Sequence, residues 1–150
     1  MTSPQGKLER FLQILLIEDN PADVRLVTLA LAGLVAQYKL KVVGNGREAL
    51  DFLKKRDHYF DALRPDFIFL DLHLPIIDGK EVLREIKKDP ELENIPVVVV
   101  TGETFEQSYS EVNSLRANFF IPKPVTLDRF SIAIKYLEEV LGVRMFPKES

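Results

Sequence analysis

The sequence predicts an α/β fold in which helices cover both faces of a parallel β-sheet. Five short apolar runs are continuous rather than alternating, which indicates strands that are buried on both faces. Segments with apolar residues at helical spacing separate these runs. The connections between successive runs are also too long for hairpins. Strand and helix alternate five times along the chain, as expected for a doubly wound sandwich.

Each predicted strand consists mainly of aliphatic or aromatic residues and is bounded by polar residues, glycine or proline. They are expected at residues 12–17, 40–43, 67–70, 97–100 and 119–121. A five-stranded doubly wound sheet most often has the strand order 2-1-3-4-5. We therefore predict a (βα)5 flavodoxin-like sandwich with a parallel sheet in this order.

The predicted helices carry apolar residues three and four positions apart. In the first, Asn20 is a suitable N-cap and Pro21 a suitable first residue. Val24, Val27 and Leu31 then follow on one face. The helices are expected at residues 22–35, 46–55, 79–88, 105–115 and 126–141, and the fourth has the weakest pattern.

Length and composition predict one domain at residues 12–141, with a polar leader at 1–11 and a short tail at 142–150. The absence of cysteine excludes disulfides, thiolate metal sites and cysteine nucleophiles. The formal charge of −3 disfavours nucleic acid and anionic membrane surfaces as partners. No apolar run approaches the roughly 20 residues that span a bilayer. These features predict a cytoplasmic protein.

Polar side chains follow four of the predicted strands, where ligands bind in an open α/β sheet. Glu18 and Asp19 follow the first strand, Asp71 the third, Thr101 the fourth and Lys123 the fifth. Two carboxylates about 4 Å apart repel by roughly 4 kcal/mol at an effective dielectric of 20, so three carboxylates need a cation. Oxygen ligands of this kind suit Mg²⁺, which also binds phosphoryl oxygens.

We therefore predict a phosphoryl-transfer site with Asp71 as the nucleophile. Lys123 is expected to neutralise charge on the phosphoryl group, and Thr101 to donate a hydrogen bond to it. Each residue alone also has a structural explanation, as a helix-capping acid, a loop acid or a turn lysine. Their coincidence at four strand ends favours the functional interpretation. The two histidines, His58 and His73, are far apart in the sequence and predict no metal site.

These motifs together resemble the receiver domain of two-component response regulators. They are IEDN at 17–20, LDLHLP at 70–75 with Asp78-Gly79, VTG at 100–102 and Lys123-Pro124. The resemblance covers about residues 13–141. It implies that Glu18, Asp19, Asp71 and the backbone carbonyl of His73 bind Mg²⁺ or Mn²⁺.

The resemblance further implies a phosphoacceptor rather than an enzyme in the usual sense. Asp71 would take a phosphoryl group from a sensor histidine kinase in a Mg²⁺-dependent reaction. Thr101 would then move toward the phosphate and Phe120 would turn inward, which changes the face that contacts other proteins. The Lys123–Pro124 peptide bond would be cis.

Three further segments resemble the single-domain regulators that are paired with phytochrome-type sensor kinases. They are DNPADVRL at 19–26, RPD at 64–66 and DPEL at 89–92. This subgroup implies a homodimer through the fourth helix, fifth strand and fifth helix. Apolar candidates for that surface are Phe119, Tyr136, Met145 and Phe146, for which packing in the core or tail is an equal alternative.

The sequence departs from the family pattern at four positions. His73 stands where Asn is common, and Gly102 where Ala or Ser is common. Pro122 precedes Lys123, and Phe120 lacks the hydroxyl of a tyrosine. These departures concern the amplitude of switching and the phosphate lifetime, because no residue that the phosphoryl chemistry needs is missing.

Three other functions compete with this interpretation. A flavodoxin-like enzyme that binds FMN or a nucleotide needs a phosphate loop rich in Gly, Ser or Thr after the first strand, and here that loop is acidic. A phosphatase with an aspartyl nucleophile needs a second Asp where His73 stands. A degenerate receiver that acts as a passive protein-binding module is distinguished only by a phosphorylation assay.

Overall fold

The computed structural model describes residues 11–102, 110 and 113–147. Its core is a five-stranded parallel sheet with the order β2-β1-β3-β4-β5, which confirms the predicted fold class and strand order. The strands are β1 (Leu12–Ile17), β2 (Tyr38–Val43), β3 (Phe67–Leu70), β4 (Val97–Thr101) and β5 (Phe119–Pro122). The central strands β3 and β4 are fully buried, as their continuous apolar runs predict.

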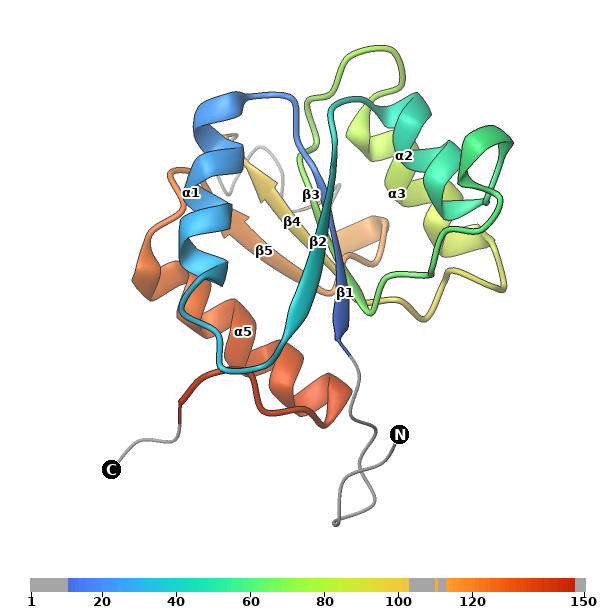
Figure 1. The fold of residues 1–150 in the computed structure, drawn as a ribbon. Coiled ribbons are helices and arrows are strands. Elements are labelled where there is room, and N and C mark those ends of the chain that lie inside the picture. Colours follow the sequence, from blue (N-terminus) through green and yellow to red (C-terminus); the bar gives the residue numbers. More distant parts are fainter. Residues whose placement is uncertain (1–10, 103–109, 111–112, 148–150) are drawn as a thin grey trace.

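Helices cover both faces of this sheet, with α1 and α5 on one face and α2 and α3 on the other (Figure 1). The helices are α1 (Pro21–Leu31), α2 (Gly46–Leu53), α3 (Gly79–Lys88) and α5 (Leu127–Leu141), with a short 3₁₀ helix, η1 (Asp57–Tyr59). The helix predicted at 105–115 falls mostly outside the described residues. None of the described helices is long and apolar enough to cross a membrane.

The N-cap prediction for α1 is confirmed. The Asn20 side chain accepts hydrogen bonds from the backbone N–H groups of Ala22 and Asp23, at 2.8 and 3.3 Å. Pro21 occupies the first helical position, where its missing N–H has no cost. This cap determines where α1 begins, directly above the carboxyl end of β1.

Two hydrophobic cores form because successive residues of a strand point to opposite faces. Ile14 and Leu16 of β1 pack toward α1 and α5, whereas Leu15 and Ile17 pack toward α2 and α3. Each fully buried side chain of this size contributes roughly 1.5–3 kcal/mol. The two cores hold the strand ends, and the polar residues that follow them, in a rigid arrangement.

The chain after α5 returns to the first of these cores. Gly142 adopts φ +66°, a left-handed conformation that suits a glycine after a helix. Met145 is completely buried, and its backbone N–H donates to the Glu138 carboxylate at 2.7 Å. The Phe146 N–H donates to the same carboxylate at 3.1 Å. Of the two alternatives for Met145, packing in the core is therefore confirmed, and this side chain is not part of a partner surface.

Candidate functional site

Three carboxylates meet at the carboxyl edge of the sheet. Glu18 and Asp19 follow β1, and Asp71 follows β3. One carboxylate oxygen from each lies within 4.8 Å of the others. The register of β1 and β3 explains this, because Ile17 is paired with Leu70 and the next residues of both strands are therefore neighbours. Glu18 and Asp71 are buried, at 4% and 5% exposure, whereas Asp19 is exposed.

One ammonium group faces this cluster from the end of β5. Lys123 Nζ lies 2.8 Å from a Glu18 oxygen and 3.2 Å from an Asp71 oxygen. It also lies 2.8 Å from an oxygen of Asp23, in the first turn of α1. The backbone N–H of Lys123 donates to the carbonyl of Thr101 at 2.9 Å, which continues the pairing of β4 with β5.

Backbone donors hold two of the carboxylates in place. The N–H of Asn20 donates to Glu18 Oε2 at 3.2 Å, and the N–H of His73 donates to Asp71 Oδ1 at 3.0 Å. Each carboxylate therefore has one oxygen bound by the backbone and the other directed at Lys123. Hydrogen bonds of this kind are stronger than neutral ones and fix the orientation of both groups.

Gly79 permits a close approach of two chain segments beside Asp71. A Cβ atom at this position would lie 2.1 Å from the carbonyl oxygen of Asp71. The Gly79 N–H donates to the carbonyl of Leu72 at 3.0 Å, which ties the start of α3 to the loop after β3. Gly79 was part of the motif noted in the sequence, but its steric role depends on this contact.

The electrostatics of the site follow from burial and from the crowding of like charges. Burial and the neighbouring Asp71 raise the pKa of Glu18 to about 7, although Lys123 and the Asn20 N–H oppose this change. Burial alone lowers the pKa of Lys123, but the hydrogen bonds with Asp23 and Glu18 outweigh it and raise this pKa above its usual value. Lys123 is therefore a permanent cation at neutral pH.

The other residues singled out in the sequence differ in their surroundings. Thr101 is completely buried at the end of β4, and Phe120 on β5 is half-buried against the core on the α2 and α3 side. The side chain of His73 is exposed. The Lys123–Pro124 peptide bond is cis. Asp23 is the site residue that the sequence did not reveal, because an acid in the first turn of a helix needs no other explanation.

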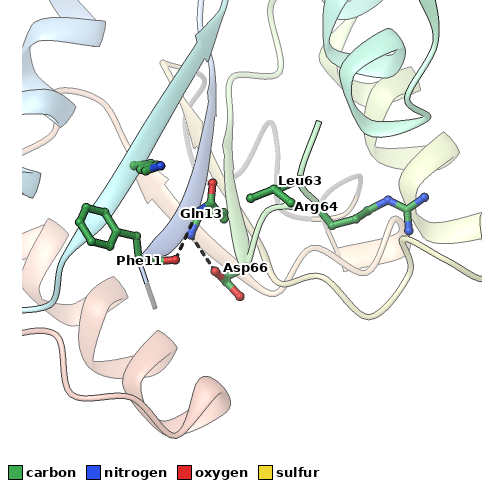
Figure 2. Close-up of a pocket in the computed structure, with 6 residues that line it drawn as sticks. Phe11, Gln13, Leu63, Arg64 and Asp66 are labelled. Atoms are coloured by element: carbon green, nitrogen blue, oxygen red, sulfur yellow. Dashed lines mark hydrogen bonds between the residues drawn. The ribbon is translucent and has the colours of Figure 1, made fainter. Parts of the chain in front are cut away.

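A pocket lies at the opposite, amino edge of the sheet (Figure 2). It has a volume of about 440 Å³. Its lining residues come from the starts of β1 and β2 and the segment before β3, and they are Phe11, Gln13, Lys39, Leu63, Arg64 and Asp66. None of them belongs to the acidic cluster. This pocket is therefore separate from the place where the charged groups converge.

The donor set fits a small divalent cation. Glu18, Asp19 and Asp71 offer only hard oxygen ligands, which Mg²⁺ and Mn²⁺ prefer. The same acidic loop after β1 disfavours a bare phosphate or flavin phosphate, since a phosphate-binding loop presents N–H donors without carboxylates.

Comparison with known proteins supports the same interpretation. A family model described as the response regulator receiver domain matches residues 14–135. The response regulator Rcp1 of Synechocystis sp. is 41% identical over 110 residues, which is 73% of this chain and 75% of Rcp1.

Two solved structures have a similar fold. The phosphorylated cyanobacterial phytochrome response regulator RcpA has a TM-score of 0.78 at 38% identity, over 91% of this chain and 99% of that one. The Mn²⁺-bound form of Rcp1 has a TM-score of 0.77 at 36% identity, with the same coverage.

Proposed function

This chain belongs to the response regulator receiver domain family, and we propose that it signals by accepting a phosphoryl group on Asp71. One observation carries the assignment of the acceptor. Asp71 follows β3, the middle strand, and lies between two sets of functional groups. Glu18 and Asp19 follow β1 on one side, and on the other side Thr101 ends β4 and Lys123 follows β5.

The reaction is a transfer between two nucleophiles. An oxygen of Asp71 forms a bond to phosphorus, and the bond from phosphorus to a histidine nitrogen of the donor breaks, with its electron pair remaining on that nitrogen. Lys123, 3.2 Å from Asp71, is placed to offset charge on the phosphoryl oxygens. The backbone bond from His73 keeps the other Asp71 oxygen in place.

We propose that Mg²⁺ or Mn²⁺ is held by the side chains of Glu18, Asp19 and Asp71 and by the backbone carbonyl of His73. The convergence of the three carboxylates supports this set, and so does the Mn²⁺ in the structure of Rcp1. When bound, such a cation offsets the negative charge that develops between the acceptor and the phosphoryl group.

The family implies a histidine kinase as the partner, and we propose a kinase of the phytochrome type. The similarity to RcpA, Rcp1 and the bacteriophytochrome response regulator RtBRR supports it, the last at 33% identity and a TM-score of 0.77. We further propose α1 as part of the kinase contact. This helix begins beside the site, and Leu26 and Leu29 leave its outer side apolar, with Leu29 at 61% exposure.

We also propose a homodimer through β5, α5 and the predicted fourth helix, which falls mostly outside the described residues. Ile132 and Val140 are exposed on α5, and Tyr136 lies between them at helical spacing. The Tyr136 ring packs against Phe119 of β5, with centroids 5.3 Å apart. Ile132→Asp, with the exposed α1 change Thr28→Asp as control, should lower the dimer fraction in sedimentation. A wild-type chain that stays monomeric at high concentration, phosphorylated or not, would contradict the dimer.

The proposed switch links this face to the site. Thr101 is the last residue of β4, and Phe120 lies on β5, three residues before Lys123, with its side chain against the core on the α2 and α3 side. A phosphoryl group adds a charge of about −1.5 to −2 at Asp71. We propose that Thr101 and Phe120 rearrange in response.

The test of the acceptor is phosphorylation by acetyl phosphate with Mg²⁺, measured by intact mass. The wild-type protein should gain one phosphoryl group and Asp71→Asn none. Asp66→Asn, the same change at the amino edge, should behave like the wild type. Phosphorylation of Asp71→Asn at the wild-type rate would refute the assignment. A wild-type protein that gains no phosphoryl group from acetyl phosphate or from sensor kinases would favour the passive binding module.

A further inference from the structure

The Lys123 ammonium has three N–H donors and contacts three carboxylates. Two of them, Glu18 and Asp71, belong to the candidate metal and phosphoacceptor set. The third, Asp23, lies outside that set, yet its oxygen is 2.8 Å from Lys123 Nζ and is closer than the Asp71 oxygen at 3.2 Å. The donors of Lys123 are therefore fully used before any phosphoryl group arrives.

The position of Asp23 is fixed by the start of α1. The Asn20 side chain accepts from the Asp23 N–H at 3.3 Å, which holds the first turn beside the site. The Asp23 side chain is 18% exposed and that of Lys123 is 17% exposed, so the pair is largely shielded from water. A shielded pair of this kind is screened less than a surface ion pair.

We propose that Asp23 is a positioning residue that holds the Lys123 ammonium and competes with the incoming phosphoryl group for it, which slows the phosphorylation of Asp71. This inference rests on the proposed function of Asp71. Glu18 and Asp71 both change their environment when a cation and a phosphoryl group bind. Asp23 binds neither the cation nor the phosphoryl group, so its carboxylate continues to attract the Lys123 ammonium toward α1.

The direction of the effect follows from charge. A phosphoryl donor is an anion, and its phosphoryl oxygens need a donor from Lys123 as the bond to Asp71 oxygen forms and the bond to the leaving group breaks. Asp23 engages that donor and adds a negative charge of its own nearby. The same negative charge favours a cation in the acidic cluster. A neutral Asn at position 23 should therefore strengthen the binding of a phosphoryl anion and weaken the binding of Mg²⁺.

The experiment compares Asp23→Asn with the wild type. Asn keeps an acceptor oxygen of similar reach but loses the charge. With acetyl phosphate and saturating Mg²⁺, we expect phosphorylation to be roughly threefold faster, the size expected for one partly shielded charge. Beryllium trifluoride, an anion that mimics the phosphoryl group, should bind more tightly. The affinity for Mg²⁺ alone, measured by thermal stability or calorimetry, should be lower.

A spectroscopic measurement tests the positioning role directly. The ¹⁵Nζ signal of Lys123 should be visible in the wild type, because ammonium protons held in ion pairs exchange slowly. It should broaden in Asp23→Asn and return in Asp23→Glu, which restores the charge. Asp128→Asn is the matched control, since Asp128 is also the acid in the first turn of a helix, α5, and forms part of no described site. It should leave the rates and the Lys123 signal unchanged.

Phosphorylation of Asp23→Asn at or below the wild-type rate would overturn the inference, as would a Lys123 signal identical to that of the wild type. Asp71→Asn, measured in parallel, separates this result from a failure of the proposed function. If Asp71→Asn is inert while Asp23→Asn matches the wild type, only the role of Asp23 is wrong. If Asp71→Asn is phosphorylated normally, the acceptor assignment is wrong.

Discussion

The two edges of the sheet differ in how their charged groups are arranged. At the carboxyl edge, the carboxylates of Glu18, Asp23 and Asp71 converge on the ammonium group of Lys123. At the amino edge, the pocket of about 440 Å³ has charged residues whose bonds point in separate directions (Figure 2). Asp66 accepts from the Gln13 N–H at 2.7 Å, and Arg64 pairs with Glu91 at 3.0 Å.

This difference shows that converging charge, and not the presence of a pocket, distinguishes the candidate site from the amino edge. Crowded carboxylates repel one another, so a folded protein keeps them together only where a cation or a reaction uses them. The charged groups at the amino edge instead connect segments of the fold, through the hydrogen bond of Asp66 with Gln13 and the ion pair of Arg64 with Glu91. The following predictions test this contrast, beginning with the largest expected effect.

Gly79→Ala should have the largest effect, because its Cβ would lie 2.1 Å from the carbonyl oxygen of Asp71. We expect a loss of roughly 3 kcal/mol in the free energy of unfolding, since the backbone beside the site must move. Phosphorylation of Asp71 should fall with it. Urea unfolding and the acetyl phosphate assay measure both quantities.

Gly44→Ala is the control for that change, because a Cβ there has no atom within 4 Å. It should alter stability by less than about 1 kcal/mol. Equal effects at the two positions would show that the close approach of α3 to Asp71 is not what limits position 79.

Mg²⁺ should stabilise the folded protein through the acidic cluster. A ligand at a hundred times its dissociation constant adds about 2.7 kcal/mol to the free energy of unfolding. Asp19→Asn should lose most of this gain and, without Mg²⁺, should be slightly more stable than the wild type because repulsion falls. Asp66→Asn, at the amino edge, should keep the full gain. Thermal unfolding with and without Mg²⁺ measures it, and an equal loss in both variants would break the contrast between the edges.

Glu18 should make the metal-free protein less stable as the pH rises. Its pKa is about 7 in the folded state, compared with the ordinary value of 4.5 for a glutamate carboxyl. Between these two values the folded state binds the proton more tightly than the unfolded state, so stability falls as the pH rises through this window. Glu18→Gln should remove this part of the decline. Urea unfolding in a chelator at pH 5 and pH 8 measures it, and identical pH slopes in both proteins would contradict the assigned cause.

The smallest effect is expected for Asp66→Asn on stability. Asn retains an oxygen that can accept from the Gln13 N–H, so only the charge component of that bond is lost. We expect a loss within about 1 kcal/mol in urea unfolding. A loss of unfolding free energy as large as that of Gly79→Ala would mean that the charge of Asp66 contributes more to stability than this one hydrogen bond explains.

The sequence alone was sufficient for the fold class, for the approximate position of each strand and for the location of five polar residues at the carboxyl edge of the sheet. Continuous apolar runs identify strands that are buried on both faces, and parallel strands bring the residues after their carboxyl ends to one edge. The location of Glu18, Asp19, Asp71, Thr101 and Lys123 at this edge could therefore be predicted, because it depends on the topology of the sheet and not on details of packing. The start of α1 was predictable from Asn20 and Pro21 for a similar reason, since a cap depends on neighbouring residues only.

Only the tertiary structure decided the contacts between segments distant in the chain. Asp23 and Lys123 are 100 positions apart, and nothing local distinguishes Asp23 from any acid that favours the first turn of a helix. The burial of Met145 and the steric limit at Gly79 likewise depend on which segment packs against them. Local patterns determine where strands and helices form, but the packing of side chains determines which partners each charged or apolar group meets.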